Sequence, residues 1–423
     1  MLRVFFEDRS VGDVHSEAHG PRFVYDKSWV EARGAFPISV TMPLSEREVP
    51  PRRFLIWAAN LLPEAQQLAM IGLHLGIAQN DVLGLLEAIG RDTAGALSFG
   101  APGRTEMKYW SRIGGEAEIE RIIEELPRKP FLAGDDGVSM SLAGVQTKLA
   151  ISLDEDGHLY IPRDGAPSTH ILKPDSDGLP GSVYNEAYCL ALAKRCGLAV
   201  PPVTTGKAGR RRYFLIGRYD RIPAGAGRWR RLHQEDFCQV LEKPPAAKYE
   251  RNQTGIPGPT LADMIGAVRS HGLAPDTLGI FDAAVFNILA CNTDAHAKNY
   301  SLLLPAGRPR IAPLYDVMCA VPFAHVTRNL AQTIAGKARG DHLKRRHWLR
   351  FFKMAGLGAL PTVRRVRGLA ASALHNAPLA RADVEAMPAG GHPSLAAIEE
   401  AVAGRCRAII AGLDDPEGSE LPA

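Results

Sequence analysis

The chain has 423 residues, a length too great for one compact hydrophobic core, so we expect two or three domains. Apolar residues make up 46% of the sequence and charged residues 23%, which is ordinary for a globular protein in water. No apolar run approaches the ~20 residues that a membrane helix needs, so no membrane partner is expected. The segment MLRVFFEDRS carries acidic residues early and lacks a long apolar stretch, which argues against a signal peptide.

The cysteines and the basic residues indicate where the protein works and what it touches. The six cysteines lie at positions 189, 196, 238, 291, 319 and 406, without the spacing of a metal site. Three of them fall in apolar helical runs, where a free thiol packs as a small hydrophobe, and we therefore expect a reducing cytoplasm. Net charge is only +4, but three basic clusters stand out: GRRR at 209–212, RWRR at 228–231 and LKRRHW at 343–348. Most such clusters are solvated loops, and a minority contact the phosphates of nucleic acids.

Residues 1–112 are predicted to form a small α+β domain. Three runs are rich in β-forming residues and separated by Gly, Pro and Asp, which is typical of a small antiparallel sheet: LRVFF, RFVYDKSWV and ISVTMPL. Three runs with apolar residues three and four apart follow and predict helices: RRFLIWAANLLPE, EAQQLAMIGLHLGI and NDVLGLLEAIG. Asn80 or Asp81 is the expected N-cap of the third helix.

Residues 113–232 are predicted to form a second α+β domain. A helix over 116–127 leads into it, and SMSLAGVQTKLAISL and HLYI then form a hairpin around the turn DEDG. A third strand follows at THILKP (169–174). The next element is an amphipathic helix, YNEAYCLALAKRCGL, which ends at Gly197. Two more strands come after it, PPVTTGK and RRYFLIGRYDR. This order of elements, strands followed by one helix and then more strands, is typical of the N-lobe of a protein kinase.

Residues 233–412 turn helical after LHQEDFCQVL, and 413–423 look like a disordered tail. The chemistry is concentrated after the apolar run 281–291, which predicts a buried helix. Asp294, His296, Lys298 and Asn299 follow it, and Asp316 comes after the strand-like run YSLLL and a Pro/Gly turn.

Two carboxylates with an amide between them are the layout of phosphoryl-transfer sites. One Asp accepts the substrate hydroxyl proton, while the Asn and the second Asp hold Mg²⁺ against the phosphates. The D-x₄-N spacing from Asp294 to Asn299 is related to the kinase loop H-R-D-x-x-x-x-N. Taken singly, Asp294 could cap a helix and His296 could be a satisfied loop histidine. The set together, behind a buried helix, favours the catalytic interpretation.

Two weaker features lie earlier in the chain. Lys173 ends an apolar strand and Glu186 begins the following helix, as in the kinase arrangement in which a Glu orients a phosphate-binding Lys. The alternative is a surface Lys and a Glu that complements the helix dipole. The loop SLAGVQTK holds a single glycine, Gly144, so a phosphate-cradling Gly-rich loop is not demonstrated. Gln146 and Lys148 are expected to alternate with the apolar residues of a strand.

Together, these motifs resemble the HipA family of toxin serine/threonine kinases. The resemblance extends over most of the chain and rests on SLAGVQTKL, THILKP, NEAYCLALAKRCGL, RYDR, HQEDFCQ, KYE (248–250), NTDAHAKN and PLYD. It implies an α+β, bilobal protein-kinase-like fold with a largely helical C-lobe that uses ATP and Mg²⁺. It also implies that the first hundred residues are the small N-terminal subdomain that some systems carry as a separate protein.

The resemblance also implies residue roles. Asp294 is the catalytic base, and Asn299 and Asp316 are the Mg²⁺ ligands. The ATP-binding set consists of Lys173 and His296 at the phosphates, Gly144 and Gln146 in the covering loop, and backbone at Glu235 and Phe237 against adenine.

In that covering loop, Ser141 corresponds to an autophosphorylated serine. Ser139 forms an S-x-S pair with it, so either or both could be modified. Thr147 departs from the best-known member, which has Glu there.

The usual partner in this family is a HipB-like helix-turn-helix antitoxin that binds operator DNA with the kinase as corepressor. Known substrates are aminoacyl-tRNA synthetases, glutamyl-tRNA synthetase in the best-studied case. Two other interpretations stay open. One is a DNA-associated corepressor subunit with incidental kinase activity, which rests on the basic clusters. The other is a small-molecule phosphotransferase with the same catalytic core.

Overall fold

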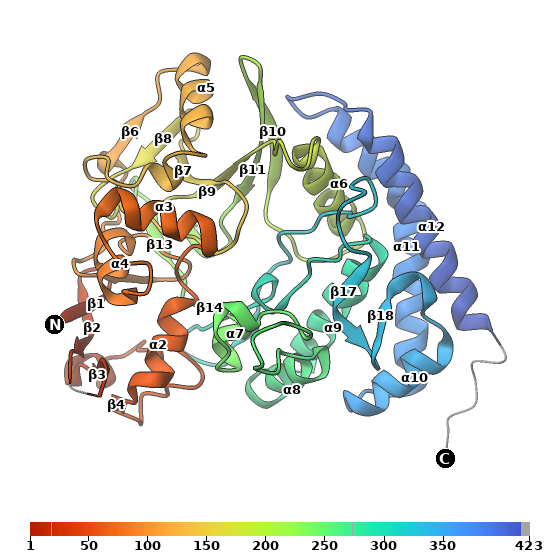
Figure 1. Cartoon of the computed structure of the whole chain (residues 1–423), viewed down its shortest axis with the longest axis horizontal. Coiled ribbons are helices and arrows are strands. Elements are labelled where there is room, and N and C mark those ends of the chain that lie inside the picture. The colour runs from red at the N-terminus through yellow and green to blue at the C-terminus, as the bar shows by residue number, and fades with distance from the viewer. Residues whose placement is uncertain (18, 273, 416–423) are drawn as a thin grey trace. The chain divides into compact units, whose positions relative to one another are not determined.

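The computed structural model describes residues 1–17, 19–272 and 274–415, and the chain divides into two compact units (Figure 1). The first unit combines Met1–Pro174, Lys207–Pro245 and Ser301–Pro309, and the second takes Asp175–Gly206, Ala246–Tyr300 and the chain from Arg310 onward. Both contain helices and strands, which confirms the predicted α+β class. The predicted domain boundaries at 112, 232 and 412 stay predictions beside this division.

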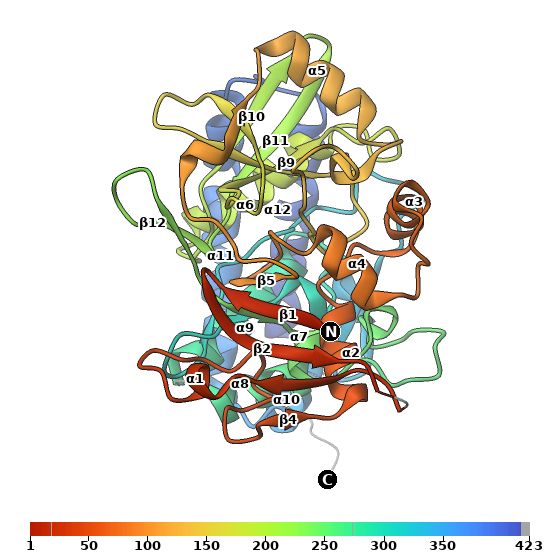
Figure 2. The same cartoon turned by 90° about the vertical axis from the view of Figure 1, so that its left-hand side faces the viewer.

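The first unit begins with a five-stranded antiparallel sheet in the order β4-β3-β2-β1-β5 (Figure 2). Its strands are β1 (Leu2–Phe6), β2 (Arg9–His15), β3 (Arg22–Tyr25), β4 (Glu48–Val49) and β5 (Leu97–Phe99). The accompanying helices are α1 (Lys27–Val30), α2 (Pro51–Ala59), α3 (Ala65–Leu75) and α4 (Val82–Ile89). Alternate residues such as Leu2 and Val4 are buried, so one face of the sheet supplies the core.

Local polar contacts explain where this region agrees with the prediction and where it differs. Asp81 is the N-cap of α4, as predicted, and accepts a hydrogen bond of 2.9 Å from Gly84 N. The second half of RFVYDKSWV is helix rather than strand, because Asp26 accepts from Ser28 N and caps α1. ISVTMPL forms only an isolated bridge, between Ser39 and Met42. The strand β2 was not predicted, since its charged residues hide the alternation of its buried positions.

A second antiparallel sheet of the first unit has the strand order β11-β9-β7-β8-β6. Its strands are β6 (Trp110–Arg112), β7 (Leu149–Leu153), β8 (Leu159–Pro162), β9 (His170–Pro174) and β11 (Arg211–Gly217), and β10 (Val203–Ala208) begins in the second unit and ends in the first. The register Ser152↔Tyr160 confirms the predicted hairpin around DEDG. β7 starts only at Leu149, so Gln146 and Lys148 precede the strand, contrary to the expected alternation.

Shorter elements complete the first unit. They are η1 (Met107–Tyr109), α5 (Glu116–Glu125), η2 (Pro130–Leu132), the ribbon β12 (Arg221–Pro223) and β13 (Trp229–Arg231), β14 (Gln234–Asp236), α7 (Phe237–Val240) and β15 (Ser301–Leu303). β14 pairs antiparallel with β15, with Glu235 opposite Leu302. η3 (Pro245–Ala247) spans the point where the chain passes to the second unit.

The RYDR motif belongs to a buried ion network in the first unit. Three guanidiniums and two carboxylates are at most 3% exposed: Arg218, Arg221, Arg231, Asp92 and Asp220. Asp92 lies 2.8 Å from Arg221 Nη2 and 3.4 Å from both Arg218 Nη1 and Arg231 Nη2. The motif therefore ties the segment after α4 to β12 and β13.

The second unit is built mainly from helices: α6 (Ser182–Arg195), α8 (Leu261–His271), α9 (Ala274–Leu289), α10 (Arg345–Met354), α11 (Ala359–Glu385) and α12 (Ser394–Asp414). Its smaller elements are η4 (Ala297–Asn299), β16 (Arg310–Ile311), β17 (Asn329–Ile334), β18 (Lys337–Arg339) and η5 (Gly340–His342). α11 and α12 lie side by side (Figure 1), and both pack against α6 and α9.

Two predictions about these helices need correction or qualification. α6 is not amphipathic, because every residue from Ser182 to Ala193 is buried. α12 continues to Asp414, past the predicted end at 412, and 416–423 of the predicted tail lie outside the described residues. No helix in the described part of the chain has both the length and the apolar character that a membrane crossing requires.

One cation in each basic cluster is paired with a carboxylate of the protein. In the cluster 209–212, Arg211 pairs with Glu124 of α5 at 3.3 Å. In 228–231, Arg231 is buried in the ion network. In 343–348, Lys344 Nζ lies 2.5 Å from Asp415 just after α12, so this cation sits where it complements the C-terminal end of the helix.

Candidate active site

The loop that carries Asp294 is shaped by the end of α9. Cys291, two residues after the end of α9, adopts a positive φ of 57°, which reverses the direction of the chain. Asn292 N then donates to Asn287 O at 2.9 Å, and the two side-chain amides are joined at 2.8 Å. These contacts fasten the start of the loop to the buried helix that the sequence predicted.

Asp294 is exposed. Its backbone is held on both sides: Asn292 Oδ1 accepts from Asp294 N at 3.0 Å, and Asp294 O accepts from Asn299 Nδ2 at 2.9 Å. The hydroxyl of Tyr249 donates to Asp294 Oδ1. Sequence reasoning gave Tyr249 no role, although it noted the KYE motif, and its position shows that it orients the carboxylate.

His296 is buried beside Asp294, with a T-shaped contact of 5.1 Å between its ring and that of Tyr249. Burial, followed by the positive charge of Lys248, holds the pKa of His296 well below its ordinary value, so the imidazole is neutral near pH 7. Among the described residues, no group hydrogen-bonds to its Nδ1. A buried polar atom without a protein partner is free to bind a ligand.

Asn299 and Asp316 supply the oxygen atoms that a Mg²⁺ ion prefers. The Asn299 amide nitrogen is used by Asp294 O, which leaves its oxygen as the atom that can bind a cation. Asp316 has a positive φ of 57°, an unusual conformation for a residue with a side chain and one that is enriched at functional sites. The donor set therefore fits a hard divalent cation.

Two hydrogen bonds join the Asp294 loop to the Asp316 loop within the second unit. Asn292 Nδ2 donates to Asp316 O at 3.4 Å, and the hydroxyl of Tyr315 donates to Lys298 O at 2.8 Å. The structure thus brings together four of the residues predicted from sequence: Asp294, His296, Asn299 and Asp316.

Lys173 and Glu186 fall in different units. Lys173 lies in β9, buried and opposite Phe214 of β11. Glu186 is buried in α6. Each is placed as predicted within its own unit, and their pairing stays a prediction.

The predicted covering loop is irregular in the first unit. Gly144 has a φ of +105°, a conformation that favours glycine, and a Cβ there would lie 2.6 Å from Lys148 Nζ. Lys148 Nζ donates to Ala143 O at 2.5 Å, and Gln67 Nε2 donates to Val145 O at 2.7 Å. Gln146 follows these contacts and is half-buried.

Both candidate phosphoserines are hydrogen-bonded within the first unit. Ser141 is fully buried, and its hydroxyl donates to Leu61 O at 2.8 Å. The Ser139 hydroxyl donates to Ala88 O at 2.9 Å and accepts from Arg91 N at 3.2 Å. The Ser141 hydroxyl is therefore hidden from solvent in this conformation, whereas Ser139 is half-buried.

The predicted adenine-binding backbone occupies the junction of β14 and α7. Phe237 is the first residue of α7, so its N–H has no carbonyl one turn earlier to bond to. The side chain of Glu235 is buried and accepts from Val40 N at 2.8 Å. Burial raises the pKa of Glu235 to about 8. This structural use of the side chain was not predicted.

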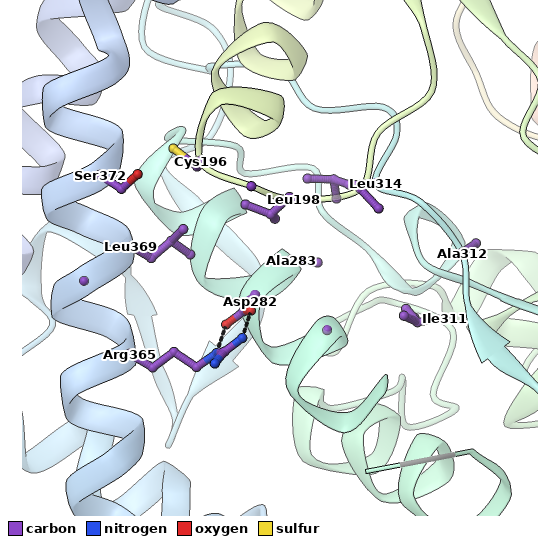
Figure 3. A pocket seen from close by; sticks show the side chains of 14 residues that line it. Cys196, Leu198, Asp282, Ala283, Ile311, Ala312, Leu314, Arg365, Leu369 and Ser372 are labelled. Carbon is purple, nitrogen blue, oxygen red and sulfur yellow. Dashed lines mark hydrogen bonds and ion pairs between the residues drawn. The ribbon is translucent and has the colours of Figure 1, made fainter. Parts of the chain in front are cut away.

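A cavity of about 450 Å³ lies wholly within the second unit and does not include the predicted site residues. Figure 3 shows its walls, which come from the turn after α6, from α9, from the segment 311–314 and from α11. Asp282 and Arg365 form a two-pronged ion pair at its edge. The cavity is therefore separate from the Asp294 loop.

Comparison with known proteins gives one consistent result. The model of the HipA N-terminal domain matches residues 2–100, and that of the HipA-like C-terminal domain matches residues 140–378. The Y4mE protein of Sinorhizobium fredii, which is named as a kinase, is 35% identical over 86% of this chain and 88% of its own length. The serine/threonine-protein kinase toxin HipA of Shewanella oneidensis is 31% identical over 79% of this chain and 78% of its own.

A solved structure agrees with these matches. In the complex of Shewanella oneidensis HipA and HipB with operator DNA, the matching chain has a TM-score of 0.83 and 25% identity, with complete coverage of both chains. The predicted kinase-like fold with an additional N-terminal subdomain is confirmed by this match.

Proposed function

Because this chain belongs to the HipA family, we propose that it is the serine/threonine kinase toxin of a toxin–antitoxin pair. It transfers the γ-phosphate of ATP to a hydroxyl of a protein substrate. The observation that carries the proposal is the convergence of Asp294, Asn299 and Asp316 at the end of α9, held together by the hydrogen bonds between their loops.

The side chains divide the work of phosphotransfer. Asp294, oriented by Tyr249, accepts the proton of the attacking hydroxyl. Asn299 and Asp316 hold Mg²⁺, which neutralises the charge of the ATP phosphates when bound. Neutral His296 and cationic Lys173 contact those phosphates, and backbone at Glu235 and Phe237 binds adenine.

Regulation and partners follow the family pattern. The segment with Gly144 and Gln146 covers ATP, and phosphorylation at Ser141, Ser139 or both switches the enzyme off. A HipB-like antitoxin binds the chain and brings it to operator DNA, as in the Shewanella oneidensis complex. The substrate is a translation enzyme of the aminoacyl-tRNA synthetase class, such as glutamyl-tRNA synthetase, and the protein acts in the cytoplasm.

The decisive test uses Asp294→Asn, which keeps the shape of the side chain and removes the base. We expect phosphotransfer to fall by ~10²–10⁴ while ATP binding persists. Asp156→Asn, in the exposed turn between β7 and β8, is the matched control and keeps full activity. Wild-type turnover in the Asp294 variant would remove this residue from the mechanism.

The same assay separates the proposal from its alternatives. Labelled ATP in cell lysate should mark a protein band, whereas a small-molecule phosphotransferase would label only low-mass products. A corepressor with incidental activity would bind operator DNA directly, with a salt slope set by its own cations. The internal pairing of Arg211, Arg231 and Lys344 speaks against direct contact through these residues.

A further inference from the structure

Two buried thiols flank the active-site loops, and the proposed mechanism uses neither. Cys291 comes two residues after the end of α9 and three before Asp294. Cys319 comes three residues after Asp316. One cysteine thus belongs to the catalytic loop and the other to the metal-binding loop.

The two cysteines are close neighbours within the second unit. The backbone N–H of Ala320, the residue after Cys319, donates to Cys291 O at 3.1 Å, and the Cys291 thiol donates to Ala401 O at 3.7 Å. Asn185 fixes Cys319 from the other side: its side chain accepts from Cys319 N at 2.7 Å and donates to Cys319 O at 2.9 Å. The two cysteines therefore lie on neighbouring backbone segments, which is the first requirement for a disulfide between them.

A metal is a poor explanation for the pair. The one group of three or more His, Cys, Asp or Glu with metal-binding spacing among the described residues is Asp154, Asp156 and His158, in the β7–β8 turn. Within the described residues, Cys291 and Cys319 therefore have no third thiolate, imidazole or carboxylate close enough to complete a site with them. Two thiols without further ligands are suited to redox chemistry instead.

We propose that Cys291 and Cys319 form a reversible disulfide under peroxide stress, and that this bond slows phosphotransfer. The effect on phosphotransfer rests on the proposed kinase function, while formation of the bond does not. Transient disulfides of this kind are the form in which cytosolic proteins use the bond.

The oxidation proceeds in two steps. Cys291, which is 3% exposed against 0% for Cys319, meets hydrogen peroxide first. The Cys291 thiol loses its proton and its sulfur attacks one peroxide oxygen; the O–O bond breaks, the leaving hydroxide takes up that proton, and a sulfenic acid and one water result. The Cys319 thiol then attacks the Cys291 sulfur, the S–O bond breaks, and a second water leaves. Two thiols thus lose two electrons and reduce one peroxide to two waters.

The bond would act on phosphotransfer through loop geometry. A disulfide brings two sulfur atoms to ~2.05 Å, well inside their contact distance as separate thiols. Pulling the segments at 291 and 319 together displaces the carboxylate of Asp316 relative to that of Asp294. Because a misplacement of about 1 Å can cost ~10² in rate, we expect turnover to fall at least about tenfold.

The test exposes the full-length reduced protein to a hydrogen peroxide series, followed by alkylation in denaturant and peptide mapping. We expect a crosslinked peptide pair containing Cys291 and Cys319, and its loss on treatment with dithiothreitol. Cys196→Ser, which removes the more accessible thiol beside the cavity, is the matched control and should leave the crosslink unchanged.

Activity is measured on the same samples. Oxidised wild-type protein should lose at least about tenfold in turnover and recover with reductant, while Cys319→Ala should keep its own initial rate throughout the series. Absence of the crosslink when Cys196 is fully oxidised, or a crosslink to Cys189 instead, would overturn the proposal. A crosslink without loss of turnover would overturn its regulatory part. A reduced enzyme with no phosphotransfer would refute the kinase function and leave the mapping result intact.

Discussion

Replacing Asp92 with Asn should destabilise the first unit severely. Asp92 is buried in the ion network and faces three guanidiniums, of Arg218, Arg221 and Arg231. It also accepts hydrogen bonds from the backbone N–H of Ser168 at 3.1 Å and from its hydroxyl at 2.6 Å. The variant keeps the shape of the side chain and removes one of two negative charges.

The size of the effect follows from the charge balance. In the wild type three buried cations face two carboxylates, and in the variant they face Asp220 alone. Removing one partner from a buried ion pair costs about 3–5 kcal/mol, because a charge is left without compensation in a medium that solvates it poorly. At about 2–4 °C per kcal/mol for a unit of this size, the melting temperature should fall by roughly 6–20 °C.

Thermal and urea unfolding of the full chain measure this change, with Asp13→Asn as the control. Asp13 pairs with Arg3 at 3.0 Å, but both side chains are partly exposed, so the control should cost at most about 1 kcal/mol. Equal destabilisation by the two variants would refute the argument that burial makes the network costly to break.

The same network predicts how stability depends on pH. Its arginines hold the pKa values of Asp92 and Asp220 below the ordinary value, against the opposing effect of burial. A carboxylate with a lowered folded pKa contributes its full stability above the unfolded pKa of ~3.9 and loses it as the pH falls further. The difference between wild type and the Asp92 variant should therefore be constant from pH 7 to about 5 and shrink below about 4.

Three further predictions test other parts of the chain. Because the pKa of Glu235 is raised to about 8, the stability of the wild type falls as the pH rises between about 4 and 8. Glu235→Gln should therefore be more stable than the wild type at pH 8.5 in thermal melts. It should still bind ATP in calorimetry. Asp316→Asn should weaken nucleotide binding only when Mg²⁺ is present, and equal calorimetric affinities would remove it from the metal site. Lys344→Glu with Arg345→Glu should lower the melting temperature, because both contact the end of α12, and should leave the salt slope of operator binding unchanged.

The sequence was most informative where chemistry and periodicity coincide. Apolar spacing, interrupted by polar residues at the turns, indicated the buried helix before Asp294, the hairpin around DEDG and the strand that contains Lys173. The order of the site residues after that helix was enough to predict that Asp294, Asn299 and Asp316 belong together. Residue patterns within a short stretch of sequence are enough to predict such features.

Other features depend on contacts between distant parts of the chain, which no local pattern records. Tyr249 lies 45 residues before the carboxylate that it orients. The Asp92 carboxylate is 129 residues from Arg221, and sequence alone shows only an unremarked Asp and an RYDR motif. The all-round burial of α6 likewise follows from packing by α11 and α12, since its polar residues look like a solvent face when read alone.

Because Ser141 is buried, it can act as a switch only after the segment around it has opened. Its backbone N–H donates to Asp92 O at 3.0 Å and its hydroxyl to Leu61 O, so a kinase must open this segment to reach it. A phosphate adds about −1.5 to −2 charges, which a fully buried position cannot accommodate. Once Ser141 is phosphorylated, its segment cannot return to the buried position.

We therefore expect phosphorylated protein to exchange the backbone amides of 138–148 much faster than unmodified protein, and to bind ATP more weakly. Hydrogen exchange with mass spectrometry measures the first effect and calorimetry the second. Ser141→Ala should resist inactivation but lose stability by about 1–3 kcal/mol, because Leu61 O is left without its buried donor. Ser139→Ala controls for the neighbouring serine. Unchanged exchange in 138–148 after complete phosphorylation would show that the modified segment stays seated, and the switch would then have to work by another route.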